Sequence, residues 1–188
     1  MFRGLISVLT PLLLTLPFTP SWADEYSDTI TIFKEAGESG TFFDTAYGYA
    51  VFPTIGKGGF IVGGAYGPGR VYEGGNAIGE TSMVQVSLGF QLGGQAYSEI
   101  VFFQDQRALK EFTSGNFEFG ADASVVAITA AANAQAGTEG LSAGASGGKR
   151  DATTVGQYNK GMATFVVAKG GLMFQATIAG QAFSYKPF

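Results

Sequence analysis

The chain has 188 residues, a formal net charge of −4, no Cys and no His. It therefore has no disulfide, no thiolate nucleophile and no imidazole, the side chain most often used as metal ligand and general base. We accordingly expect no metal and no cofactor. A pI near 4.8 argues against nucleic acid as a partner, because nucleic acid requires a basic face. The length suits one domain, and 17 Phe and 8 Tyr can fill a core.

The N-terminus has the pattern of a secretory signal peptide, predicted over Met1–Ala23. Its apolar run, Leu5–Leu16, is short for a membrane span, and Ser21 and Ala23 offer small residues before a cleavage site. A retained anchor fits less well, because prolines interrupt the segment. We therefore expect Asp24–Phe188 to be an exported domain, periplasmic or secreted, in peripheral contact with a membrane at most.

Two helical regions are predicted in the exported domain. Asp24–Tyr47 has apolar residues near helical spacing and is expected to be helical in part, with a break at Ser39-Gly40. Gln106–Phe112 consists mostly of good helix formers. Asp105 is placed to cap this helix and Gly115 to end it.

Alternating residues and glycine pairs predict antiparallel strands elsewhere. Val84–Leu92 alternates apolar and polar residues, which predicts a half-buried strand with one polar face. Gly93-Gly94 then predicts a tight turn into a second strand over Ala96–Phe103, because such turns require positive φ. Similar turns are predicted at Gly74-Gly75 and Gly170-Gly171.

Other segments are less determined. Gly58-Gly59 and Gly63-Gly64 are interpreted as bulges or places of close backbone approach. Ala121–Ala134 is ambiguous between helix and strand, and Gln135–Thr153 reads as a loop. The predicted fold is a single α+β domain of mostly antiparallel, barrel-like hairpins with an N-terminal helical segment and one further short helix. An outer-membrane barrel fits less well, because a helix interrupts the strand series.

No motif in the sequence assembles a catalytic site. Gly144–Gly148 matches G-x-S-x-G, but its surroundings are loop-like and the chain has no His to serve as base. The spacing of the carboxylates singles out no acid/base pair, and solvated charge is the better interpretation of Glu73, Glu80, Glu99, Asp105, Glu118 and Asp122. We therefore do not expect an enzyme.

Six residues are candidates for contact with lipid. Two aromatic residues on the N-terminal segment offer an apolar edge, and four basic residues beside glycine pairs are expected to gather at loop ends and meet lipid phosphates. The alternative for the basic residues is scattered solubilising charge. The candidates are Phe42, Phe43, Lys57, Lys149, Arg150 and Lys169.

Several sequence blocks resemble the SYLF domain family. Ala46–Pro53 and Gly56–Gly64 are similar to its A-x-G-x-A-V-F-P strand and Gly-rich turn, and later blocks match in the same order at Val86–Gln95, Phe119–Val125 and Ala168–Met173. The resemblance covers nearly the whole exported domain. It implies a non-enzymatic lipid-binding domain.

The resemblance also implies which partners to expect, and the charge of this chain changes that expectation. Eukaryotic SYLF domains bind phosphoinositides through a basic N-terminal helix, and some bind actin. Here the matching segment is acidic and forgoes the roughly 1 kcal/mol that each Lys or Arg gains near an anionic surface. We expect a lipid or membrane surface as partner, and not actin. The alternative is a structural or protein-interaction module of the cell envelope without lipid specificity.

Overall fold

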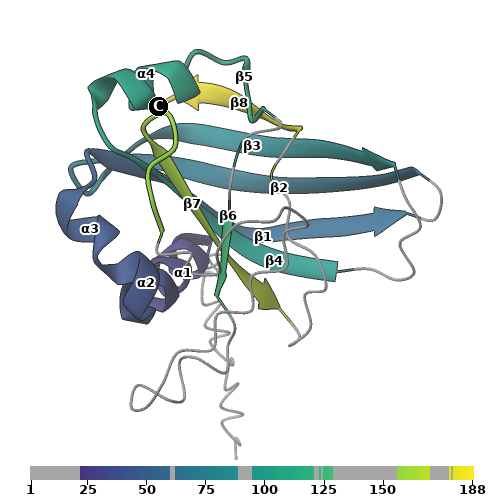
Figure 1. Cartoon of the computed structure of the whole chain (residues 1–188), viewed down its shortest axis with the longest axis horizontal. Helices are drawn as coiled ribbons and strands as arrows, with labels where there is room; N and C mark the ends of the chain where they lie inside the picture. Colours follow the sequence, from purple (N-terminus) through teal and green to yellow (C-terminus); the bar gives the residue numbers. More distant parts are fainter. Residues whose placement is uncertain are drawn as a thin grey trace, which may run out of the picture.

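The computed structural model describes residues 22–59, 62–88, 95–120, 123, 125–128, 156–169, 178 and 180–188. In these residues eight strands form one curled sheet in the order β5-β8-β3-β2-β1-β4-β7-β6 (Figure 1). All pairs are antiparallel except β6 with β7. The strands are β1 (Gly48–Gly59), β2 (Val62–Glu73), β3 (Asn76–Leu88), β4 (Gln95–Phe103), β5 (Phe117–Glu118), β6 (Val125–Ile128), β7 (Met162–Lys169) and β8 (Gln181–Pro187).

The N-terminal segment is helical, as predicted, but it is interrupted elsewhere. It forms α1 (Trp22–Glu35), α2 (Gly37–Gly40) and α3 (Phe42–Thr45), so the breaks fall at Ala36 and Thr41 and not at Ser39-Gly40. No helix in the described ranges has both the length and the apolar character needed to cross a bilayer.

Two local predictions are confirmed by backbone geometry. Gly74 and Gly75 have φ of 55° and 83° and form the turn between β2 and β3. Helix α4 (Gln106–Phe112) begins after Asp105, whose Oδ1 accepts a hydrogen bond from the Ala108 backbone N–H at 2.8 Å. Gly115 follows the helix with φ of 93°.

Buried side chains form one cluster on each face of the sheet. The curled sheet encloses the first cluster, and Phe112 of α4 closes this cluster at one end. The strand residues of the first cluster include Phe52, Met83, Val101 and Phe183. The second cluster lies between α1–α3 and the outer face of β1, β4 and β7 (Figure 1), and includes Phe33, Val51, Phe102 and Phe165. The helices therefore cover only part of the outer face.

Strand β3 shows the predicted alternation with the burial reversed. Met83 and Gln85 are buried inside the curl, whereas Val84 and Val86 face outward and are exposed. The alternation correctly groups residues by face, but the direction of curling decides which face is inside. A polar side chain therefore lies in the core and an apolar pair lies on the surface.

Of the remaining predictions, some are wrong, one is decided and some lie outside the described residues. Gly58 pairs with Gly64 in regular register across β1 and β2, and the register shift lies between Val51 and Gly56. The predicted bulge is therefore not at Gly58-Gly59 or Gly63-Gly64. Val125–Ile128 is a strand. The turns at Gly93-Gly94 and Gly170-Gly171, the loop Gln135–Thr153 and the G-x-S-x-G segment lie outside the described residues.

Candidate functional site

The two predicted aromatic candidates pack against the core. The Phe42 ring centroid lies 5.0 Å from that of Phe165 and 5.1 Å from that of Tyr158. The Phe43 ring meets Phe102 edge-on at 4.8 Å. Both Phe42 and Phe43 are half-buried and belong to the cluster beneath the helices. Their contacts hold α3 against the sheet.

We therefore expect Phe42→Ser to reduce stability by about 2 kcal/mol, because a half-buried ring loses part of the 3–5 kcal/mol typical of deleting a buried Phe. Urea unfolding of the purified variant measures this loss. Ile32→Ser is the matched control, because Ile32 lies on α1 with 39% of its surface exposed. Equal losses from the two variants would contradict the packing role of Phe42.

Two of the four basic candidates lie at one end of the sheet, on either side of β4. Lys57 on β1 pairs with Gln95, and Lys169 on β7 pairs with the next residue, Ala96. Burial lowers the pKa of the Lys57 ammonium group. Lys169 Nζ donates a hydrogen bond to Thr54 Oγ1 at 2.6 Å and lies 3.8 Å from Glu25 Oε1. Lys149 and Arg150 lie outside the described residues.

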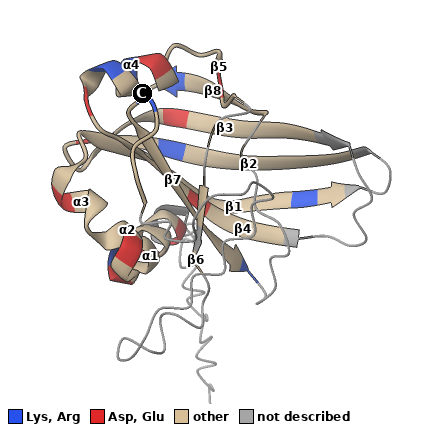
Figure 2. Ribbon diagram, in the orientation of Figure 1, with Lys and Arg blue, Asp and Glu red and all other residues tan. Residues whose placement is uncertain are grey.

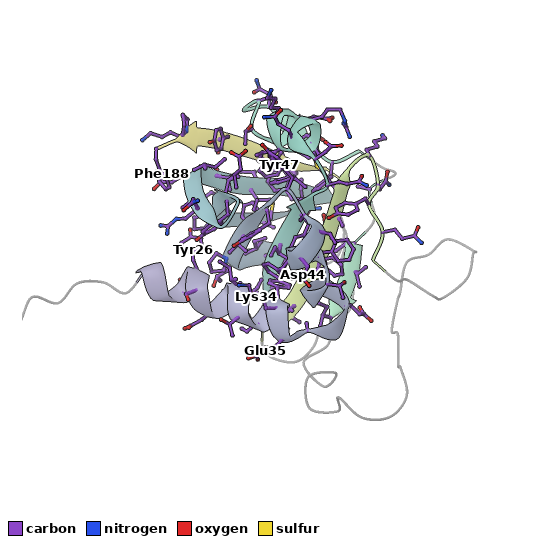
Figure 3. All side chains as sticks on the ribbon, turned by 90° about the vertical axis from the view of Figure 1, so that its left-hand side faces the viewer. Tyr26, Lys34, Glu35, Asp44, Tyr47 and Phe188 are labelled. Atoms are coloured by element: carbon purple, nitrogen blue, oxygen red, sulfur yellow. The ribbon has the colours of Figure 1, made fainter. Side chains whose placement is uncertain are left out.

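An open groove of about 730 Å³ lies between the helical segment and the β2–β3 turn. Figure 3 shows Lys34 and Asp44 on the helical segment, with Tyr47 above them. The Lys34 ammonium lies 5.4 Å from the centre of the Phe43 ring, and the Tyr47 hydroxyl donates a 2.5 Å hydrogen bond to Glu73. The Lys34 and Tyr47 side chains thus already have partners within the chain.

The sheet interior contains a carboxyl group, that of Glu99, so the interpretation of this residue as solvated charge is wrong. Glu99 on β4 is completely buried, and Gln181 Nε2 on β8 donates to its Oε2 at 2.9 Å. The same Nε2 lies 3.3 Å from the Tyr97 hydroxyl oxygen. Strands β4 and β8 are not neighbours in the sheet, so these contacts cross its interior. Burial raises the pKa of Glu99 to about 8, although the Gln181 hydrogen bond opposes the rise.

The outer face of β1, β2, β3 and β8 has a region that no described residue covers and that contains no charged residue, which we call the uncharged face. Its largest side chains are Tyr66, Val84 and Val86, which expose 59%, 47% and 70% of their surfaces. Most of the length of β2 and β3 is free of charged residues (Figure 2). The face consists of Gly56, Gly58, Gly64, Tyr66, Pro68, Ser82, Val84, Val86, Ala182 and Ser184.

Strand pairing makes the uncharged face continuous. Tyr66 pairs with Val84, which pairs with Ala182, so an apolar row crosses three strands and ends at the exposed Glu118 of β5, which pairs with Ala182. Val86 lies beside this row, opposite Gly64. Exposed apolar patches of this kind mark surfaces that meet a partner or a membrane. Sequence reasoning missed this surface because its alternating pattern is the same as that of a half-buried strand.

The described residues do not form an evident centre for metal chemistry. Within them, no group of three or more Asp or Glu side chains is arranged to hold a metal ion. Among the described residues, the surface features that stand out are the uncharged face and its border, and exposed apolar surface of this kind suits binding.

Comparison with known proteins gives two matches. A family model described as Ysc84, Las17-binding protein actin regulator, matches residues 84–186. The chain is also 26% identical over 157 residues to Beta cell expansion factor A of Aeromonas veronii. That match covers 82% of this chain and 51% of the relative, so the chain spans about half the length of the curated relative it matches. The matched family is not known for catalysis.

Proposed function

The chain belongs to the Ysc84 family of SYLF-domain proteins, and we propose that it binds lipid membranes through the uncharged face. At the level of the family, the domain is a lipid-binding or interaction module. The observation that carries the proposal is the exposed row of Tyr66, Val84 and Ala182, with Val86 beside it. Tyr is well suited to a membrane interface, because its ring is apolar and its hydroxyl remains hydrated.

Charge favours an apolar mode of membrane binding. The chain has a net charge of −4, and helix α1 carries mostly acidic residues, with Lys34 in its last turn. Such a helix gains nothing from an anionic surface, whereas an uncharged sheet face approaches a bilayer without removing ions from water. We therefore expect binding that changes little with salt and does not require anionic lipid.

We further propose that the protein acts after export. The proposal rests on the leader pattern of Met1–Ala23 and places the domain in the periplasm or the medium. In that setting the domain is a peripheral membrane protein and not an enzyme. Proteomic detection of a mature N-terminus near Asp24 in the exported fraction is the direct test, and a retained Met1 there would contradict export by this leader.

A protein-interaction module of the envelope is the second candidate. It is favoured by β6, the four-residue strand Val125–Ile128, which ends the described sheet and pairs only with β7. An edge of this kind can accept a strand from a partner. Stoichiometric recovery of one envelope protein together with absence of vesicle binding would favour this candidate.

Co-sedimentation with phosphatidylcholine vesicles tests the membrane proposal. We expect the triple variant Tyr66→Thr, Val84→Thr, Val86→Thr to lose about tenfold in partitioning, because it removes the apolar surface and keeps β-branched residues in the strands. The loss should be the same at low and high salt.

Ile32→Thr is the control, because it removes an exposed apolar side chain from α1 and leaves the uncharged face intact. Circular dichroism and thermal unfolding establish that the triple variant is folded. If that folded variant partitions like the original protein, the uncharged face is not the membrane contact.

A further inference from the structure

Arg70 lies on the outer side of β2 between two aromatic side chains. Its guanidinium carbon is 4.4 Å from the centre of the Tyr26 ring on α1 and 5.9 Å from that of Phe188. Figure 3 shows Tyr26 and Phe188 on the same side of the molecule. Arginine stacks well on aromatic faces, and a stacked guanidinium keeps its N–H donors directed along its edge. The rings therefore restrict the orientation of the guanidinium.

The described residues offer no hydrogen-bond acceptor to this guanidinium. In the described part of the chain, no group accepts a hydrogen bond from Arg70 or pairs with it as an ion, and its Nε is buried without a partner. Glu80 is directly opposite Arg70 on β3 but forms no ion pair with it. A buried donor left unpaired is unfavourable, so an acceptor supplied by a ligand would stabilise the Arg70 side chain.

The position of Arg70 relates it to the uncharged face. Both Tyr66 and Arg70 lie on the outer side of β2, and four residues separate them, roughly 13 Å along the strand. The row Arg70, Glu80 and Lys186 borders the face, next to Pro68, Ser82 and Ser184. A membrane against the uncharged face would therefore bring its headgroups within reach of this border.

We propose that Arg70 is a binding site for the phosphate of a phospholipid headgroup. This inference rests on the proposed function, because the membrane on the uncharged face supplies the ligand. A guanidinium binds two phosphate oxygens through parallel hydrogen bonds, and this geometry suits a phosphodiester. Lys186 adds a second cation on the same border, and Glu80 between them keeps the local charge low, which suits zwitterionic headgroups.

The site is tested with two kinds of vesicle, whose lipid headgroups either contain a phosphate group or lack one. Partitioning is measured on phosphatidylcholine vesicles and on vesicles of an uncharged galactolipid, whose headgroup has no phosphate. We expect the original protein to prefer phosphatidylcholine by about fivefold, the factor that corresponds to roughly 1 kcal/mol for the net gain of a hydrogen bond. Arg70→Gln should remove this preference and leave partitioning to the galactolipid unchanged.

Two further variants separate recognition from structure. Arg70→Lys keeps a cation over Tyr26 but lacks the two-pronged donor, so it should retain fold and lose most of the preference. Arg107→Gln is the charge-matched control, since Arg107 lies on α4 and pairs with Glu111 at 3.1 Å. It should keep the preference.

The outcomes distinguish the two proposals. Loss of binding to both vesicle types in the Tyr66, Val84, Val86 variant supports the membrane face, and unchanged binding there overturns it. A folded Arg70→Gln protein that still prefers phosphatidylcholine overturns the phosphate site alone. Arg70-dependent binding of inorganic phosphate in solution, without a difference between vesicle types, would assign the site to a free anion and overturn the lipid assignment.

Discussion

Replacing Glu99 with Gln is expected to stabilise the protein at pH 8 and to remove much of its pH-dependent stability. Burial raises the pKa of the Glu99 carboxyl from its usual 4.5 to about 8, so the folded protein holds a proton that the unfolded chain releases. The stability contributed by this proton is complete below about pH 4.5 and is lost as the pH rises toward 8. The loss amounts to roughly 1 kcal/mol per pH unit.

Glutamine suits the position because it has no charge to desolvate. Its amide oxygen can accept the hydrogen bond that Gln181 Nε2 donates to Glu99. Glu99 Oε1 and Gln181 Oε1 both lack a hydrogen-bond partner among the described residues. The NH2 group of a glutamine at position 99 supplies hydrogen-bond donors at this place. The substitution therefore keeps the contact across the sheet interior and removes the titration.

Urea unfolding between pH 5 and pH 9 measures this effect. The original protein and Glu99→Gln should converge at the acidic end and diverge as the pH rises, with the variant several kcal/mol more stable at the alkaline end. Glu80→Gln is the matched control, because it makes the same chemical change on the exposed side of β3. Parallel curves for the original protein and Glu99→Gln would show that Glu99 does not carry the proton.

The parts of the fold that were predicted correctly depend on local signals. The Gly74-Gly75 turn requires positive φ, and Asp105 caps α4 through a backbone N–H three residues away. Such features are set by a few neighbouring residues. The antiparallel, barrel-like arrangement was likewise predictable from alternating segments joined by glycine turns.

The candidate site was much less predictable, because it depends on which side of the sheet is inside. Val84 and Gln85 have the same neighbours in sequence whether the sheet curls one way or the other. Glu99 meets Gln181 across 82 positions of sequence, and Arg70 meets Tyr26 across a helix–sheet contact. Phe42 and Phe43 were identifiable as an apolar pair, but only the fold shows that their rings pack inward.

The glycines of β2 explain how the sheet encloses its interior. Phe52 and Ile55 are three residues apart, yet both are fully buried inside, because the register of β1 shifts between them. A Cβ at Gly69 would lie 2.5 Å from the Phe52 ring, and one at Gly67 would lie 2.5 Å from Ile55 Cγ1. The two glycines thus leave the space that two large side chains occupy.

We therefore expect Gly69→Ala to destabilise the protein by about 1–3 kcal/mol, the usual cost of overfilling a packed core. Gly56→Ala is the matched control, because a Cβ there meets nothing within 4 Å, and it should be neutral or slightly stabilising. Urea unfolding measures both changes.

Adding Phe52→Leu to Gly69→Ala provides the decisive comparison. Leu at position 52 opens the space that the new methyl group needs, so the double variant should be more stable than the sum of the single effects predicts. Strict additivity would mean that the methyl group is accommodated elsewhere and that Gly69 does not shape the curl. Because the curl decides that Val84 and Val86 face outward, the same comparison tests the physical origin of the uncharged face.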